Sequence, residues 1–131
     1  MFLDSNVFIH LYLDEGPNGQ ASKRLHARIV RGEQHAITSP MVLDEVVYHF
    51  MDRKGVGCAL EIWDRMRKTP NLRVAPIDDT VMTHVPDFMR QGLEPHDAFH
   101  AAVMKANGVS TICSYDKDFD KVKGIKRQAP K

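Results

Sequence analysis

Short apolar runs alternate along the chain with longer stretches whose apolar residues recur every three or four positions. Such runs are typical of short buried strands, and such stretches are typical of amphipathic helices. We expect strands at residues 1–3, 35–38, 71–75 and 109–113, with an edge strand at 124–127. Because helical stretches separate the first four of these, the pattern predicts an α/β fold with a small, mostly parallel sheet.

Residues that start and stop helices support this division. Ser39 and Pro40 are typical of a helix start, because serine caps the first turn and proline suits the first helical position. This helix is expected to reach Lys54 and to end near Gly55, and Gly108 is expected to end another. The remaining helices are expected at residues 5–14, 21–30, 58–68, 79–90 (with Asp79 as the cap) and 93–107, with residues 16–19 as a loop.

The composition is that of an ordinary globular protein, and 131 residues predict a single domain, residues 1–131. The net charge of +1 does not by itself indicate a nucleic-acid binder. Cys58 and Cys113 are far apart, and we expect both to be reduced and buried. No apolar run is long enough to span a bilayer, and Asp4 falls where a signal peptide needs an apolar stretch. These features predict a cytoplasmic protein without a membrane partner.

Four acids occupy related places in the predicted elements. Asp4 follows the first strand and Asp116 follows the fourth, while Asp97 and Glu45 lie in the first two turns of their helices. In a doubly wound sheet the carboxyl ends of the strands meet at one edge, so these carboxylates should converge there. Glu45 has mostly apolar neighbours, and a carboxylate in such surroundings normally meets a cation. Hard oxygen ligands suit Mg²⁺ or Mn²⁺.

The segments that carry these acids resemble the PIN domain, and are most similar to VapC-type toxins of toxin–antitoxin pairs. The resemblance rests on residues 3–9 (LDSNVFI), 39–46 (SPMVLDEV), 92–102 (GLEPHDAFHAA) and 112–119 (ICSYDKDF). Each motif is weak alone, but the four occur in the family's order and cover essentially the whole chain. The resemblance implies a three-layer α/β/α fold and a metal-dependent endoribonuclease that uses one or two ions of Mg²⁺ or Mn²⁺. It also implies a small antitoxin as partner and a homodimer.

The resemblance also implies roles for individual residues. The four acids named above match the metal-binding and catalytic carboxylates of the family, and Asp118 matches a frequent fifth ligand. Two polar residues match positions that order the site, namely Asn6 and Ser114. For Asp118 the alternative is an acid that merely starts a helix.

Two other functions share part of this pattern. A housekeeping RNA-processing PIN nuclease would use the same chemistry. A PIN-like module that binds RNA or a protein without cutting would not need the complete set of acids, and metal-dependent cleavage would distinguish it from a nuclease.

Three other kinds of site fit poorly. An EF-hand loop starting at Asp116 would need glycine at Lys121 and glutamate at Arg127. His96 and His100 have the spacing of a zinc-binding pair on a helix, but no third ligand is obvious. A phosphatase of the haloacid dehalogenase type would need aspartate at Asn6.

Two further surfaces are predicted, each with a plainer alternative. The basic residues near Asp116 are expected to contact the RNA backbone, or otherwise to form a solvated face: Lys117, Lys121, Lys123, Lys126 and Arg127. Four apolar residues of the helices at 39–54 and 58–68 are expected to form a groove for an antitoxin helix, or otherwise to be core: Val47, Phe50, Trp63 and Met66.

Overall fold

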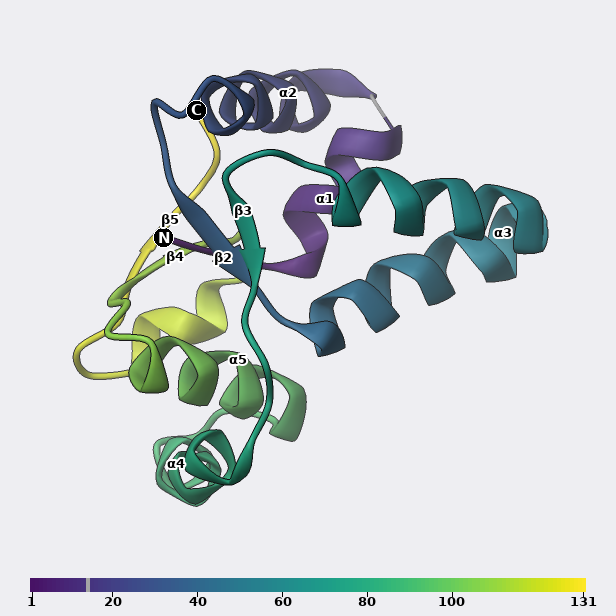
Figure 1. The fold of residues 1–131 in the computed structure, drawn as a ribbon. Helices are drawn as coiled ribbons and strands as arrows, with labels where there is room; N and C mark the ends of the chain where they lie inside the picture. The colour runs from purple at the N-terminus through teal and green to yellow at the C-terminus, as the bar shows by residue number, and fades with distance from the viewer. Residues whose placement is uncertain (14) are drawn as a thin grey trace.

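The computed structural model describes residues 1–13 and 15–131, and its centre is a sheet of five parallel strands (Figure 1). The strands lie in the order β3-β2-β1-β4-β5. Their bounds are Phe2–Leu3 (β1), Ala36–Thr38 (β2), Leu72–Val74 (β3), Thr111–Cys113 (β4) and Lys126–Gln128 (β5). Phe2 pairs with Ile37 on one side and with Ile112 on the other, which places β1 in the middle. The α/β fold with a small parallel sheet is confirmed, and the tail does add a parallel edge strand.

Helices cover the sheet in two groups on opposite sides (Figure 1). The first group packs together: α1 (Ser5–Leu13), α2 (Gly16–Val30) and α3 (Pro40–Arg67). The second consists of α4 (Asp79–Arg90) and α5 (Pro95–Ala106), which also pack on each other. A short 3₁₀ helix, η1 (Lys117–Lys121), links β4 to the turn before β5. Within the described residues, no helix combines the length and apolar character needed to cross a membrane.

The helix α3 is a hairpin of two arms, as the sequence predicted. Gly55 interrupts it with φ 83° and ψ 175°, a left-handed conformation that glycine adopts without steric cost. Ser39 caps the first arm by accepting a hydrogen bond from the backbone N–H of Val42. The hairpin projects away from the sheet (Figure 1), so much of its surface has no partner within the described chain.

Two local predictions were wrong. Residues 16–19, expected to be a loop, form the first turn of α2, where Pro17 is tolerated because the first turn needs no donated backbone bond. The buried Gly19 donates its N–H to the carbonyl of Glu15. The cap of α4 is Asp78 rather than Asp79, because the Asp78 side chain accepts from the N–H of Val81. Asp14, the expected end of the first helix, lies outside the described residues.

The core lies between the sheet and both groups of helices. Cys113 is buried in it, whereas Cys58 is only half-buried, and both are free thiols. Phe119 of η1 is fully buried, which anchors the segment that follows β4. The central strand and its neighbour contribute buried apolar residues directly before the loops that carry the acids: Phe2, Leu3, Ile112 and Cys113.

Candidate metal centre

β1 and β4 are neighbouring parallel strands, and the direction in which strands are added to the sheet changes between them. Connections from β1 run to β2 and β3 on one side, whereas β4 and β5 lie on the other. At such a switch point the loops at the carboxyl ends of the two strands diverge and leave a crevice, which is where doubly wound sheets bind ligands. Asp4 and Ser114 are the first residues after these two strands.

Asp4 is almost fully buried, with 4% of its surface exposed, yet its carboxylate is well supported. Its Oδ1 accepts the backbone N–H of Ser5 at 2.7 Å, and its Oδ2 accepts the Asn6 side-chain amide at 2.7 Å. The Ser114 hydroxyl also donates to Oδ2. Hydrogen bonds to the charged form stabilise a buried carboxylate, so the strand end holds Asp4 in a single orientation.

Asn6 and Ser114 connect the two strand ends. The Asn6 amide donates to the Ser114 oxygen at 3.1 Å, and its carbonyl accepts the backbone N–H of Tyr115 at 3.2 Å. The Ser114 oxygen accepts the backbone N–H of Asp116 at 2.9 Å. Through these hydrogen bonds the two residues contact the loop that carries Asp116.

Glu45 reaches the site from the second turn of α3. Its Oε2 lies 3.6 Å from Nε2 of His100, a side chain on α5 that is 1% exposed. Burial by itself raises the pKa of Glu45, but His100, Ser5 and His96 together outweigh burial and hold this pKa below its usual value. Glu45 is thus ionised beside Asp4. Its neighbour Asp44 is exposed, as expected from its position 100° further round the helix.

Asp97 lies in the first turn of α5, where the helix N-terminus favours a negative charge. Nevertheless its pKa is raised to about 6, chiefly by burial and then by the neighbouring charge of Asp4, with smaller contributions from Asp116 and Glu45. The nearby His100 works in the opposite direction. Burial and the charges of Asp4, Asp116 and Glu45 thus both oppose ionisation of Asp97.

The predicted acids thus converge, and the possible ligand atoms form two groups. Asp4, Glu45 and His100 make one group, and Asp97, Asp116 and Asp118 make the other, each with its ligand atoms within 4.8 Å of one another. Asp118 is held near Asp116 because its backbone N–H donates to the Asp116 carboxylate at 2.8 Å. It also lies in the first turn of η1, so both interpretations of Asp118 remain compatible with the structure. The predominantly carboxylate donor set fits a hard divalent cation.

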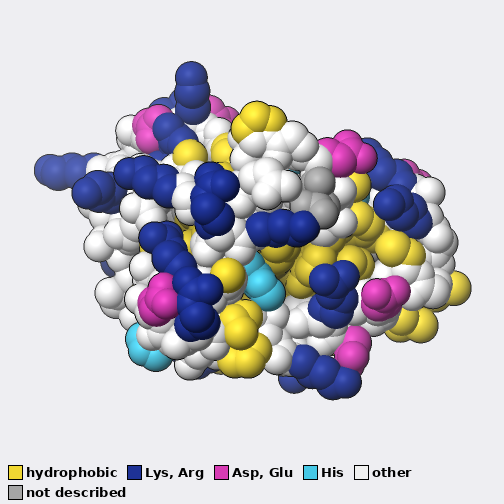
Figure 2. All heavy atoms as spheres, turned by 90° about the horizontal axis from the view of Figure 1, so that it is seen from above, with side chains coloured by type: hydrophobic (Ala, Val, Ile, Leu, Met, Phe, Trp, Pro, Cys, Tyr) yellow, Lys and Arg dark blue, Asp and Glu magenta, His cyan; other side chains and the backbone are white. Residues whose placement is uncertain are grey.

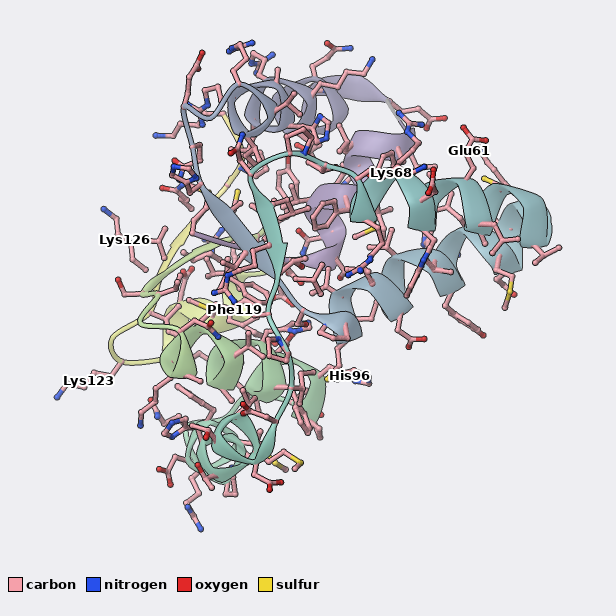
Figure 3. All side chains as sticks on the ribbon, viewed as in Figure 1. Glu61, Lys68, His96, Phe119, Lys123 and Lys126 are labelled. Atoms are coloured by element: carbon pink, nitrogen blue, oxygen red, sulfur yellow. The ribbon has the colours of Figure 1, made fainter. Side chains whose placement is uncertain are left out.

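Sequence reasoning missed His100 as part of this centre. It considered His100 only as a zinc-binding partner of His96 and judged that pair a poor fit. His96 is exposed at the N-terminal end of α5 (Figure 3) and belongs to neither group of possible ligands. The spacing of Asp97 and His100, three residues apart on one helix, could have indicated that both face the site.

Two of the basic C-terminal residues have acidic partners. Lys121 pairs with Asp118 at 2.8 Å, and Arg127 pairs with Asp120 at 2.9 Å. Lys123 and Lys126 point outward on the opposite side of the ribbon from His96 (Figure 3). Lys123 also lines a cavity of about 550 Å³ between α4, α5 and the turn before β5, and none of the site acids lines that cavity.

Comparison with known proteins identifies the family. Residues 1–125 match the family described as PIN domain. The chain belongs to the PIN domain family. This PIN domain is 28% identical to Ribonuclease VapC13 of Mycobacterium tuberculosis, over 98% of this chain and 99% of the relative. The same values relate it to a VapC ribonuclease of Mycobacterium bovis.

Solved structures share the PIN fold at lower identity. VapBC2 from Rickettsia felis, solved with a DNA fragment from its promoter, superposes with a TM-score of 0.77 at 12% identity, covering 99% of this chain and 98% of that one. VapC20 of Mycobacterium tuberculosis, described as a Sarcin-Ricin loop cleaving toxin, superposes with a TM-score of 0.72 at 20% identity. This match covers 91% of this chain and 92% of that one.

The raised pKa of Asp97 leads to a prediction about the stability of the metal-free protein. Since the folded-state pKa is about 6 and the ordinary value is 3.8, the folded protein holds the extra proton between these values. The stability that this proton contributes to the folded state is fully present below pH 4 and is lost as the pH rises through about 6. In EDTA at pH 7, Asp97→Asn should therefore have a higher free energy of unfolding than the wild type, by on the order of 1 kcal/mol after solvent screening. This difference corresponds to a melting temperature a few degrees higher.

The difference should vanish near pH 4, and the melting temperature of the exposed-site control Asp44→Asn should follow the wild type at both pH values. Thermal unfolding followed by circular dichroism measures this. An Asp97→Asn protein that melts below the wild type at pH 7 would contradict the repulsion among the acids.

Proposed function

We propose that this protein is a metal-dependent endoribonuclease and the toxin of a toxin–antitoxin pair. The observation that carries the proposal is the convergence of five acids from four separate segments on the switch point of the sheet. Membership of the PIN domain family and the ribonuclease names of the full-length relatives support it. The alternative of a non-cutting PIN-like module is less favoured, because such a module has no use for mutually repelling carboxylates that cost stability.

We assign the metal-holding role to Asp4, Glu45, Asp97, Asp116 and Asp118, with Asn6 and Ser114 in support. When bound, a divalent ion supplies Lewis-acid catalysis for hydrolysis of a phosphodiester. Hydrogen bonds from the Ser5 backbone, Asn6 and Ser114 hold the Asp4 carboxylate in one orientation. Two groups of ligand atoms are compatible with one or two ions, and Mg²⁺ or Mn²⁺ fits their oxygen donors.

The experiment that tests the catalytic proposal is RNA cleavage by the purified protein in Mg²⁺ or Mn²⁺. We expect internal cuts that EDTA abolishes and that excess Mn²⁺ restores. Cleavage that persists in EDTA would contradict metal dependence. Binding of RNA without cleavage in either ion would favour the non-cutting module instead.

An antitoxin partner would find a docking surface on α3, although not the one the sequence predicted. Phe50 and Met66 are each 1% exposed and belong to the core, and Val47 is half-buried, so only Trp63 of the predicted set is exposed. The exposed apolar residues of the hairpin form what we call the α3 apolar surface: Tyr48, Met51, Val56, Leu60 and Trp63.

The α3 apolar surface has the form expected for an amphipathic partner helix. On the second arm Val56, Leu60 and Trp63 follow one another at intervals of four and three residues, so they lie on one helical face. Figure 2 shows hydrophobic side chains gathered on the side of the molecule where α3 lies, whereas Lys and Arg gather over the opposite side. Exposed apolar groups so close together are typical of an interface.

We retain four further assignments as parts of the proposal. Residues 1–131 act as a single domain in the cytoplasm, and two copies form a homodimer. Contact with the RNA backbone remains assigned to Lys117, Lys121, Lys123, Lys126 and Arg127. Because Lys121 and Arg127 already pair with acids, their contribution to RNA affinity should be small.

A housekeeping nuclease is distinguished by expression of the protein alone and together with any small gene that lies beside its own. Toxicity that the neighbour relieves by forming a stable complex would support the toxin. Harmless expression of an active enzyme without a co-purifying partner would favour the housekeeping nuclease.

A further inference from the structure

His100 is an anomaly within the proposed oxygen-rich centre. It is 1% exposed, and its ring lies 5.4 Å from that of Phe2 on the central strand. Its Nδ1 is buried and has no hydrogen-bond partner, and its Nε2 faces two carboxylates. An imidazole used only as core packing would not be expected to face Asp4 and Glu45, because burying a polar ring beside charged groups is costly unless the ring interacts with them.

Without an ion, the carboxylates of Glu45 and Asp4 outweigh burial and raise the pKa of His100, so that a proton on the ring pairs with them. The separations are nevertheless long for hydrogen bonds, and they leave room for a shared ion in place of that proton. Nε2 of His100 lies 3.6 Å from Oε2 of Glu45 and 3.8 Å from Oδ1 of Asp4. Direct hydrogen bonds from a ring nitrogen to an oxygen are about 2.7–3.2 Å long. Two atoms that each lie about 2.2 Å from one ion, in contrast, can be up to about 4.4 Å apart. Both observed separations fall between these limits.

Nitrogen and oxygen donors together select among metals. Mg²⁺ is a hard ion that takes oxygen ligands and loses its water reluctantly, whereas imidazole is a common ligand of first-row transition ions. The second group of acids, Asp97, Asp116 and Asp118, offers oxygen alone. The two groups therefore differ in the ion that they suit.

The geometry points to His100 as a metal ligand: Nε2 completes, with Asp4 and Glu45, a position for a transition ion such as Mn²⁺ that Mg²⁺ fills less well. This inference rests on the proposed metal centre and adds a nitrogen ligand to its carboxylates. Phe2 packs against the imidazole and orients it, so that Nε2 faces the two acids before any ion arrives.

The test is pulsed electron paramagnetic resonance of the full chain with Mn²⁺ alone and no RNA. We expect the signature of a directly bound nitrogen, and we expect it to change when only the histidines carry ¹⁵N. The substitution His100→Phe, which keeps a ring beside Phe2, should abolish the signature, and the matched variant His96→Phe should keep it. Absence of histidine nitrogen coupling in the wild type would overturn the inference, whether or not any variant folds.

Calorimetric titration supplies a second, independent measurement. In His100→Phe the affinity for Mn²⁺ should fall about tenfold or more, and that for Mg²⁺ much less. Equal losses for the two ions would overturn the inference, because His100 would then act only through packing. Since neither measurement needs RNA, a protein that binds Mn²⁺ through His100 but cleaves no RNA would contradict only the proposed function.

Discussion

Replacing Asp4 by Asn should lower the rate of RNA cleavage by a factor on the order of a hundred to a thousand. The amide removes the charge that would hold the ion. It also directs an N–H₂ group at a network of donors, since Asn6, Ser114 and the Ser5 backbone all donate to the Asp4 carboxylate. The substitution therefore affects both the ligand and its orientation. Cleavage of a fluorescent RNA in Mn²⁺ would measure the loss.

The chain offers a matched control beside a second site residue. Glu45→Gln changes a predicted ligand, whereas Asp44→Asn changes the adjacent exposed acid on the same turn of α3. We expect Glu45→Gln to lose most activity and Asp44→Asn to retain it, with circular dichroism showing that both fold. Full activity in any two of Asp4→Asn, Asp97→Asn and Asp116→Asn would refute the assignment of the metal centre.

Introducing a charge into the α3 apolar surface should weaken antitoxin binding by about thirtyfold or more, the size of a hot-spot loss. Leu60 is suited to this test because it is 62% exposed and lies between Val56 and Trp63 on the same helical face. In Leu60→Asp a partner helix would have to bury a carboxylate without a counter-ion. Calorimetry with the antitoxin that co-purifies with the protein would measure the affinity.

The control is an equivalent change elsewhere on the surface. Met89 on α4 is 46% exposed and lies outside the α3 hairpin, so Met89→Asp should bind the partner as the wild type does. Neither substitution should alter RNA cleavage by the isolated protein. If Leu60→Asp binds normally and Met89→Asp does not, the partner docks on α4 and the assignment to α3 is wrong.

The sequence by itself determined most elements and the identity of the acids. Strand and helix signals act over a few residues: apolar runs that alternate with amphipathic stretches, a serine before α3 with a proline at its first position, and the glycines Gly55 and Gly108. Asp4 and Asp116 could be placed at the functional edge because they directly follow strands, and parallel strands end at the same edge of a sheet. Local signals were insufficient at residues 16–19, where packing of α2 on α1 favours a helix despite loop-forming residues.

Only the tertiary structure decided which side chains meet. Periodicity shows that α3 has an apolar face, but not which part of a projecting hairpin reaches the core, so Phe50 is buried while Leu60 is exposed. The division of the ligand atoms into two groups likewise depends on how α3 and α5 pack against the sheet. His100 joined Asp4 and Glu45 rather than His96 because burial on α5 directs it to the strand end, a long-range contact that no spacing along the chain specifies.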